Sequence, residues 1–303
     1  MSSHVERIRT AFAAIEGDRA TSPGAVRIGL LGRGIGASLT PIMHEAEGRR
    51  LGLGYRYDLI DFDRYGLADS DLGAVLAAAR RDNFRGLNVT YPFKQAIVPL
   101  LDQLSSEAAA IGAVNTVVLR PEGTSGHNTD CWGFAQSLRQ GLGPVALDRV
   151  IQFGAGGAGA AVAHALVEAG AGHVAIVDAD RDKADSLALS LSTATGAAVN
   201  GVGLDDIGSV LASANGIVNA TPVGMDKHPG TPFDPDLLSA RQWVADIIYF
   251  PRETELLRRA RALGCPVLPG GGMAVYQAVR AFELFTEIAP DAAEMRQTFA
   301  AYA

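Results

Sequence analysis

The chain has 303 residues, of which 48% are hydrophobic and 19% charged, and its formal net charge is −7. This length is typical of two domains that each bury a core of their own. The acidic balance argues against a general nucleic-acid binder. The N-terminus, residues 1–9, lacks the apolar core of a signal peptide, and the apolar region 160–177 is interrupted by charged residues and glycines. We therefore expect no membrane span and a cytoplasmic location.

Strands alternate with helices along most of the chain. The sequence predicts strands over 26–31, 55–60, 86–89 and 115–119, the last forming a hairpin with the segment after residue 123. It predicts helices over 41–51, 72–80, 97–104, 105–111, 131–142 and 273–288. Thr40 is expected to cap the helix that starts at Pro41. Repeated units of this length imply mostly parallel sheets with helices on both faces.

The most informative local signal is a glycine-rich turn that directly follows a short apolar run. The predicted strand 150–153 is followed by GAGGAG, which starts at Gly154, and then by a predicted helix over 160–169. Gly154 would permit the turn, Gly156 would let a pyrophosphate approach the backbone, and Gly159 would let the helix pack on the sheet. A second strand, 173–177, ends at Asp178, where an acidic side chain binds the ribose of NAD. The alternative is a glycine-rich turn without a ligand.

Polar side chains also gather in the N-terminal half. The hydroxyls of SLT, which ends at Thr40, are suited to grip a polar ligand or, alternatively, only to cap a helix. The stretch NVTYPFK, from Asn88 to Lys94, covers the end of a predicted buried strand, and strand ends are where parallel sheets bind ligands. An isolated lysine is otherwise an ordinary surface residue. Asn115 adds an amide and Asp130 a carboxylate, and spacing alone does not bring Asp130 to Lys94. The cysteines Cys131 and Cys265 lack metal-ligand spacing, so we expect reduced thiols and no metal site.

Taken together, these motifs closely resemble the shikimate/quinate dehydrogenase family. The matching segments run in family order from about residue 29 to 290 and begin at Ser38, Asn88, Gly112, Asn128, Gly154, Asn219, Asp246 and Gly271. The resemblance implies an α/β fold with two domains, an N-terminal three-layer α/β substrate domain and a Rossmann-type dinucleotide-binding domain. It assigns residues 1–129 plus 273–303 to the substrate-binding domain and residues 130–272 to the NAD(P)-binding domain.

The resemblance also implies roles for single residues. Lys94 and Asp130 would be the catalytic pair, because a lysine amine can accept or relay the hydroxyl proton while a carboxylate orients it. The implied substrate-binding residues are Ser38, Thr40, Asn88, Thr90, Asn115, Gln277 and Tyr249. The implied cofactor-binding residues are Gly154, Ala155, Gly156, Gly157, Ala158, Asp178, Asn219, Thr221, Val223 and Gly272. Tyr249 and Gly272 would border the nicotinamide.

Two details narrow the expected substrate and cofactor. The Ser-x-Thr at 38–40 resembles the quinate/shikimate type with relaxed substrate choice, whereas members restricted to shikimate often have Ser-x-Ser. Asp178-Ala179-Asp180 stands where NADP-preferring members typically carry Asn-Arg-Thr. A 2′-phosphate would lack its cation there and would meet a carboxylate, although Arg181 and Lys183 lie close by in the sequence. We therefore expect NAD rather than NADP.

The expected activity is the reversible oxidation of the ring C3 hydroxyl of quinate or shikimate, with hydride transfer to NAD. Two alternatives stay open. One is a shikimate-specific or aminoshikimate dehydrogenase of the same family, and the other is a dinucleotide-binding regulator without turnover. The expected partner is a small-molecule substrate, with no nucleic acid and no membrane, and with a homodimer as one option.

Overall fold

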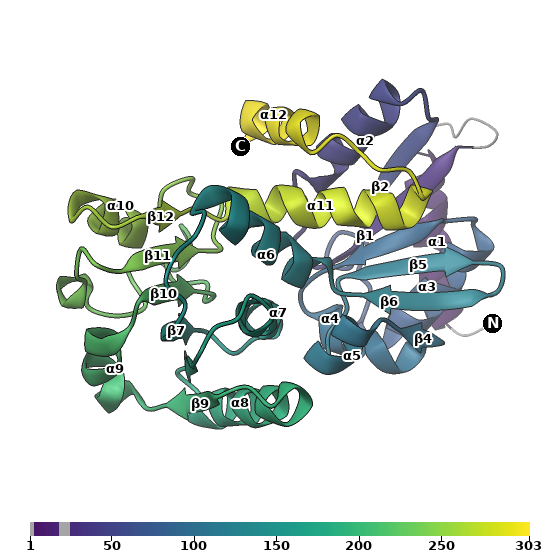
Figure 1. Cartoon of the computed structure of the whole chain (residues 1–303). Helices are drawn as coiled ribbons and strands as arrows, with labels where there is room; N and C mark the ends of the chain where they lie inside the picture. The colour runs from purple at the N-terminus through teal and green to yellow at the C-terminus, as the bar shows by residue number, and fades with distance from the viewer. Residues whose placement is uncertain (1–2, 18–24) are drawn as a thin grey trace. The chain divides into compact units, whose positions relative to one another are not determined.

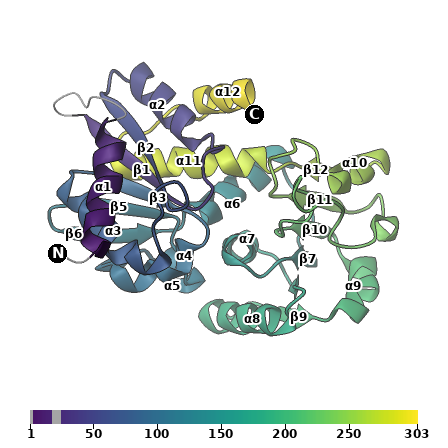
Figure 2. The same cartoon turned by 180° about the vertical axis from the view of Figure 1, so that it is seen from behind.

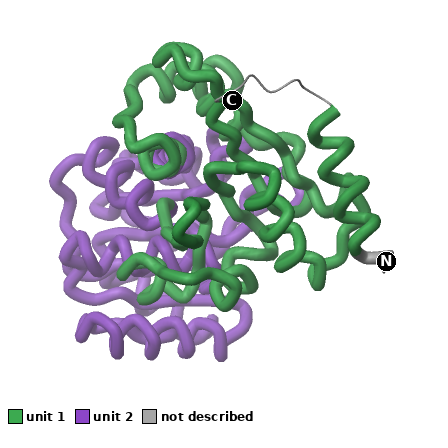
Figure 3. Tube along the Cα trace, turned by 90° about the vertical axis from the view of Figure 1, so that its right-hand side faces the viewer, with its two compact units in different colours: residues 1–129, 278–302 green, residues 130–277, 303 purple. Residues whose placement is uncertain are grey.

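The computed structural model describes residues 3–17 and 25–303. The chain divides into two compact units, of which unit 1 comprises residues 1–129 and 278–302, and unit 2 comprises residues 130–277 and 303 (Figure 3). Unit 1 is therefore assembled from both ends of the chain. The assignment of a substrate role to one unit and a cofactor role to the other, with the predicted boundary at 272/273, stays a prediction. Within the described ranges, no helix is long and apolar enough to cross a membrane.

Unit 1 contains a mixed sheet with the strand order β2-β1-β3-β5-β6-β4. The strands are β1 (Val26–Gly32), β2 (Tyr55–Asp61), β3 (Gly86–Val89), β4 (Gln103–Leu104), β5 (Thr116–Arg120) and β6 (Gly123–His127). The helices are α1 (Ser3–Gly17), α2 (Thr40–Arg50), α3 (Leu72–Arg81), α4 (Phe93–Ala96), α5 (Ser106–Ile111), α12 (Ala292–Tyr302) and the second half of α11 (Gly271–Thr286), with 3₁₀ turns at Asp69–Asp71 and Val98–Leu100. Strands β1, β2 and β3 are parallel, whereas β5 is antiparallel to both β3 and β6.

Helices cover both faces of this sheet. Phe12 of α1 and Val75 of α3 are buried in one core together with Leu87 of β3. On the other face, Phe285 of α11 is buried against Ile28 of β1. Figures 1 and 2 show α11 and α1 on opposite sides of the sheet. Unit 1 is thus the predicted three-layer α/β domain.

Unit 2 contains a parallel sheet with the strand order β12-β11-β10-β7-β8-β9. The strands are β7 (Val150–Phe153), β8 (Val174–Val177), β9 (Val199–Val202), β10 (Gly216–Asn219), β11 (Trp243–Asp246) and β12 (Val267–Leu268). The helices are α6 (Thr129–Gly141), α7 (Gly157–Glu168), α8 (Arg181–Thr195), α9 (Ile207–Ser213), α10 (Glu255–Ala262) and the first half of α11, with 3₁₀ turns at Leu204–Asp206 and Pro235–Leu237.

This order is that of the doubly wound dinucleotide-binding sheet, in which the direction of winding reverses between β7 and β10. Strands β7, β8, β10 and β11 are buried along their whole length, as expected when helices cover both faces. Leu211 of α9 and Leu256 of α10 share a core with Ile151 of β7. The side chain of Gln152, the next residue along β7, instead reaches the backbone of α7. The carboxyl ends of β7 and β10 are therefore the edge where a ligand is expected.

Two local predictions are wrong. Thr40 is the first residue of α2 and not its cap, because the hydroxyl of Ser38 accepts the N–H of Thr40 at 3.3 Å and the helix starts one residue early. The predicted helix over 97–104 is also absent. Pro99 has no N–H and disfavours helical geometry at the preceding residue, so α4 stops at Ala96 and a 3₁₀ turn and the short strand β4 follow.

Candidate active site

The glycine turn after β7 has the geometry that the sequence predicts for phosphate binding. Gly154 has a φ of +102°, which favours glycine, and a Cβ there would lie 2.5 Å from the carbonyl oxygen of Ala220. A Cβ on Gly159 would lie 2.2 Å from the oxygen of Gly154, so only glycine lets α7 pack this closely. A Cβ on Gly156, at the start of α7, would meet nothing within 4 Å. The helix N-terminus therefore has open space in front of it, as a bound phosphate requires.

Asp178 lies beside this turn. One oxygen of its carboxylate accepts the N–H of Ala155 at 2.8 Å, and the other accepts the N–H of Asp180 at 3.0 Å. The structure thus brings the acidic residue after β8 to the glycine turn after β7, as a ribose site requires. The two nearby cations have acidic partners of their own. Arg181 pairs with Asp185 at 2.8 Å, and Lys183 lies 3.6 Å from Asp180.

The loop after β10 forms the neighbouring wall of the same site. Asn219 is fully buried and its amide nitrogen donates to the oxygen of Val223 at 2.9 Å. Its amide oxygen accepts from both the N–H and the hydroxyl of Thr221, at 3.0 and 2.7 Å. Ala220 of this loop is the residue that Gly154 approaches. The side chain of Asn219 therefore shapes the loop, and the loop backbone is what a cofactor would meet.

The remaining predicted residues of unit 2 lie on and around α6 and α11. Burial raises the pKa of the Tyr249 phenol, and the Asp130 carboxylate raises this pKa further, so the two groups are close enough to interact. Asp130 is itself 8% exposed. Gln277 donates to the oxygen of Ala274 within α11. A Cβ on Gly272 would lie 2.3 Å from the hydroxyl of Ser137, so this glycine lets α11 approach α6.

The predicted substrate residues of unit 1 gather where β1 and β3 end. The N–H of Arg33, just after β1, donates to the oxygen of Tyr91 at 3.1 Å, and a Cβ on Gly32 would lie 2.4 Å from the methyl of Thr90. These contacts join the loop that leads to Ser38 and Thr40 to the loop that leads to Lys94. The oxygen of Lys94 accepts the N–H of Val114, which precedes Asn115.

Buried amides and hydroxyls form a network beneath these loops. Asn88 donates from its amide to the hydroxyl of Thr116 at 3.0 Å and accepts from the phenol of Tyr57 at 2.7 Å. Asn115 donates to the hydroxyl of Thr129 at 3.0 Å and accepts the N–H of Thr129 at 2.7 Å. Both amides are only 4% exposed. Their orientation is therefore fixed by the protein before any ligand arrives.

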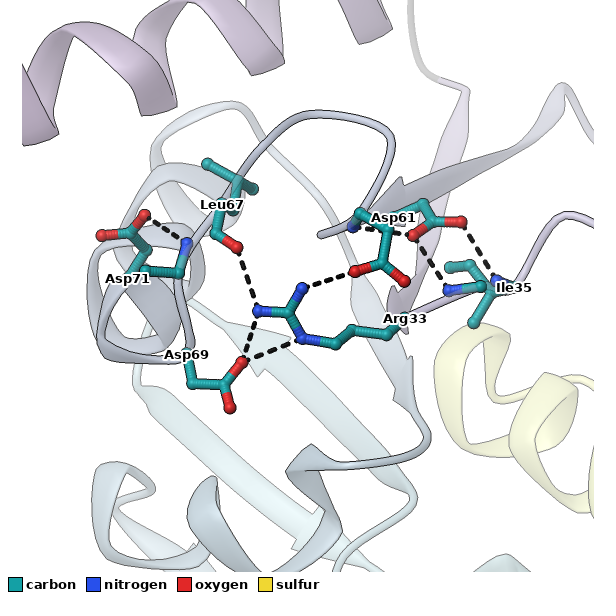
Figure 4. Close-up of polar contacts among 9 residues, drawn as sticks. Arg33, Ile35, Asp61, Leu67, Asp69 and Asp71 are labelled. Atoms are coloured by element: carbon teal, nitrogen blue, oxygen red, sulfur yellow. Dashed lines mark hydrogen bonds and ion pairs between the residues drawn. The ribbon is translucent and has the colours of Figure 1, made fainter.

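The loop between β1 and α2 is held by charged groups that the sequence analysis missed (Figure 4). Arg33 donates to Asp63 at 2.6 Å and to Asp69 at 2.5 and 2.9 Å. Asp61, the last residue of β2, accepts the N–H groups of Gly34 and Ile35 at 3.1 and 3.0 Å. A signal existed in the sequence, because Asp61 directly follows the predicted strand 55–60, as Asp178 follows the predicted strand 173–177 in the other unit. Tyr57 and Thr116 gave no such signal.

The division into units separates the predicted residues. Unit 1 holds Ser38, Thr40, Asn88, Thr90, Lys94 and Asn115. Unit 2 holds Asp130, Tyr249, Gln277 and all of the predicted cofactor residues. The structure thus supplies a polar cluster at one sheet edge and a dinucleotide site at another. The parallel sheet, its glycine turn and Asp178 define unit 2 as a Rossmann-type dinucleotide-binding domain.

Comparison with known proteins agrees with this description. Residues 30–117 match the family model of the shikimate dehydrogenase substrate binding domain, and residues 270–298 match that of the shikimate 5'-dehydrogenase C-terminal domain. The chain is 49% identical over 277 residues to quinate/shikimate dehydrogenase (NAD(+)) of Corynebacterium glutamicum, covering 91% of this chain and 98% of the relative. It is 51% identical over 269 residues to shikimate dehydrogenase (NADP(+)) of Streptomyces avermitilis, covering 88% and 92%.

A solved structure, quinate dehydrogenase from Corynebacterium glutamicum in complex with NAD, matches with a TM-score of 0.88 and 48% identity. That match covers 91% of this chain and 99% of the solved chain. The chain belongs to the shikimate/quinate dehydrogenase family. The two relatives named above have similar identity to this chain and differ in the nucleotide that their names give.

Proposed function

We propose that this protein is an NAD-dependent dehydrogenase that reversibly oxidises the ring C3 hydroxyl of quinate and of shikimate. The observation that carries the choice of NAD is the carboxylate of Asp178, held at 2.8 Å from the N–H of Ala155 in the glycine turn. From there it would face the ribose of a bound dinucleotide as an acceptor for hydroxyl groups. A 2′-phosphate would meet its negative charge instead, while Arg181 and Lys183 are paired elsewhere.

The residues of unit 2 offer hydrogen-bonding groups and a glycine-lined turn that suit a dinucleotide. The open N-terminus of α7 would bind the pyrophosphate through backbone N–H groups. Asp178 would bind the adenosine ribose, and the backbone of the loop at Thr221 and Val223 would border the nicotinamide half together with Tyr249 and Gly272. Bound NAD would accept a hydride from the substrate carbon.

The protein's own part in the chemistry is to bind the substrate and to take its proton. Lys94 would accept or relay the proton of the hydroxyl group, and Asp130 would hydrogen-bond and orient that hydroxyl. Lys94 belongs to unit 1 and Asp130 to unit 2. Under this proposal, unit 1 would be the substrate-binding domain.

Fixed polar groups of unit 1 would hold the substrate. Ser38 and Thr40 would bind its carboxylate, while Asn88, Thr90 and Asn115, with Gln277 of unit 2, would bind its hydroxyl groups. The amides of Asn88 and Asn115 are already oriented by buried partners. Preorganised donors and acceptors of this kind reduce the ordering that binding requires. A homodimer and a cytoplasmic location stay predictions.

Initial rates with quinate and shikimate, each with NAD and NADP, test this proposal. We expect turnover of both substrates with NAD and a much lower kcat/KM with NADP. A preference for NADP would contradict the nucleotide assignment. Absence of turnover in all four combinations would favour a regulator that binds a dinucleotide without reacting.

The second candidate is a dehydrogenase that acts mainly on shikimate or an amino analogue. The similarity to the Streptomyces avermitilis shikimate dehydrogenase favours it. Adding the amino analogue of shikimate to the same rate measurements separates the two. Rates with quinate that do not exceed the background, alongside rapid turnover of shikimate, would replace the first proposal with this one.

A further inference from the structure

Two helices of unit 2 bring together a thiol, an imidazole and a carboxylate away from the glycine turn. Cys131 lies in the first turn of α6, and His164 and Glu168 lie one turn apart on α7. One ligand atom from each residue lies within 4.8 Å of the other two. The Cys131 sulfur is 3.8 Å from Glu168 Oε2, and His164 Nε2 is 3.3 Å from Glu168 Oε1. Sequence spacing could not show this group, because the helices that carry it are separate in the chain.

Burial divides the three side chains into two kinds. Cys131 is 1% exposed and His164 is 6% exposed, whereas the side chain of Glu168 is 51% exposed. The sulfur and the imidazole nitrogen therefore come from inside the unit, and the carboxylate covers them from the solvent side.

Two of the three ligand-to-ligand distances are close to those of a tetrahedral zinc site, and all three lie within 4.8 Å. Zinc binds thiolate at about 2.3 Å and imidazole or carboxylate at about 2.0–2.2 Å, which sets ligand-to-ligand edges of about 3.3–3.6 Å. The observed nitrogen-to-oxygen distance of 3.3 Å falls in this range, and the sulfur-to-oxygen distance of 3.8 Å is slightly longer. Binding would require rotation of the Glu168 side chain, because one of its oxygens lies near the sulfur and the other near the imidazole.

We propose that Cys131, His164 and Glu168 bind a divalent cation of the zinc class and so tie the start of α6 to the end of α7. Magnesium and calcium prefer oxygen ligands only, so a set of one sulfur, one nitrogen and one oxygen selects zinc, cobalt and related ions. Three protein ligands leave the fourth position of the tetrahedron to water.

One feature limits the strength of the site. The Nδ1 atom of His164 is buried and has no hydrogen-bond partner among the residues that the structure describes. Metal-binding histidines usually donate this second ring N–H to an acceptor, and loss of that acceptor weakens binding by about 10–100-fold. The site is therefore of moderate affinity, and binding titrations at micromolar protein are the suitable measurement.

The test is a titration of the full chain, stripped of metal and free of any affinity tag, with Co²⁺ and then with Zn²⁺. We expect one Co²⁺ per chain, a thiolate-to-cobalt charge-transfer absorption and the visible bands of tetrahedral cobalt, all displaced by Zn²⁺. Cys131→Ser should abolish the charge-transfer absorption. Cys265→Ser is the matched control, because Cys265 is also buried in unit 2 but is not one of these three residues, and it should retain the absorption.

Glu168→Gln is a second variant. Because the side chain of Glu168 is exposed to solvent, this change should leave the packing of the core intact. It should weaken Zn²⁺ binding by at least about tenfold, measured by calorimetry, while the melting temperature without metal stays within a few degrees. The proposal is overturned if the unmodified chain takes up no stoichiometric Co²⁺, or if Cys131→Ser keeps the charge-transfer absorption. It is also overturned if Glu168→Gln binds Zn²⁺ as tightly as the unmodified chain.

Discussion

The phenol of Tyr57 in β2 donates a hydrogen bond of 2.7 Å to the side-chain oxygen of Asn88 in β3, although β1 lies between these two strands. Burial raises the pKa of this phenol well above its ordinary value, so the hydroxyl stays protonated and acts as a donor. The oxygen of Asn88 is thereby occupied, and its amide nitrogen also donates to Thr116. The same nitrogen donates to the carbonyl oxygen of Asn115 at 3.4 Å, so Tyr57 and these acceptors together orient the Asn88 amide.

Tyr57→Phe should therefore raise the substrate KM about three- to tenfold with little change in kcat, because Asn88 loses the bond that orients it. Tyr55→Phe is the matched control, since the Tyr55 hydroxyl pairs with His44 at 2.9 Å and not with the amide network. Steady-state kinetics and melting temperatures of both variants make the comparison. Equal changes in KM would mean that the Tyr57 hydroxyl serves stability only.

Lys94→Ala should lower kcat by about 10²–10⁴-fold if Lys94 takes part in proton transfer. The KM should change less, because substrate binding is shared with the hydroxyl and amide groups of unit 1. The measurement is kcat and KM with the preferred nucleotide, together with the melting temperature to confirm the fold. A variant that keeps more than about a tenth of kcat would remove Lys94 from the chemistry.

Thr40→Ser tests the choice between quinate and shikimate. Thr40 opens α2 beside the hydroxyl of Ser38, and its methyl group alters the shape of the proposed carboxylate site. Near its carboxylate, quinate differs from shikimate by a tertiary hydroxyl on a saturated ring. We therefore expect Thr40→Ser to lower kcat/KM for quinate more than for shikimate, with a difference of about 0.5–1.5 kcal/mol. The ratio of the two kcat/KM values is the readout, and equal losses would show that Thr40 does not discriminate.

Asp178→Asn tests the nucleotide preference. The change removes the charge but keeps a hydrogen-bonding side chain, so NAD binding should weaken by about 1–2 kcal/mol and NADP should gain in relative terms. Adding Ala179→Arg should improve NADP further by supplying a cation for the 2′-phosphate. The comparison is kcat/KM for both nucleotides in the unmodified chain, the single variant and the double variant. An unchanged ratio in Asp178→Asn would show that this carboxylate does not contact the ribose.

Asp246 makes the stability of unit 2 depend on pH. Burial raises the pKa of this carboxyl from 3.8 to about 6, against the bonds from Ile248, Thr254 and Asn219, which lower it. The folded state therefore favours the neutral form, and this stabilisation is complete below pH ~4 and is lost as the pH rises through about 6. Its size is at most about 3 kcal/mol.

Asp246→Asn should remove this dependence, because an amide can accept from Asn219 and Ile248 with its oxygen and donate to Thr254 with its nitrogen. The variant should gain stability relative to the unmodified chain as the pH is raised from 4.5 to 7.5. Urea unfolding at several pH values measures this difference. A difference that is constant over that range would contradict the buried, neutral carboxyl.

Local signals in the sequence predicted one part of the molecule well. The glycine turn at Gly154 and the acidic residue Asp178 are marked by their position after buried strands, and the structure brings them together as expected. Helix α7 begins at Gly157, three residues before the prediction, because the glycines that signal the turn also form the first turn of the helix. The hydrophobic face of the helix predicted over 273–288 likewise placed α11 to within two residues at each end, whereas α12 was not predicted.

Contacts between distant segments could not be predicted. The bond from Tyr57 to Asn88 depends on the register of three strands, and the proximity of Cys131 to His164 depends on how two helices pack. Neither has a spacing rule in the sequence. The predicted helix over 97–104 failed for the opposite reason, because its apolar pattern was weighed above the local restriction imposed by Pro99.

The arrangement of unit 1 has a consequence for the order in which the protein is completed during translation. Residues 278–302 belong to this unit. Among them, Phe285 packs directly against Gly86 of β3, where a side chain would leave no room for the Phe285 ring. The part of that sheet face around Gly86 therefore lacks this cover while the whole of unit 2 is synthesised. Unit 2 is continuous from Asp130 to Gln277, so its contacts are available as soon as that stretch has left the ribosome. Unit 1, whose N-terminal part is synthesised first, is therefore completed after unit 2.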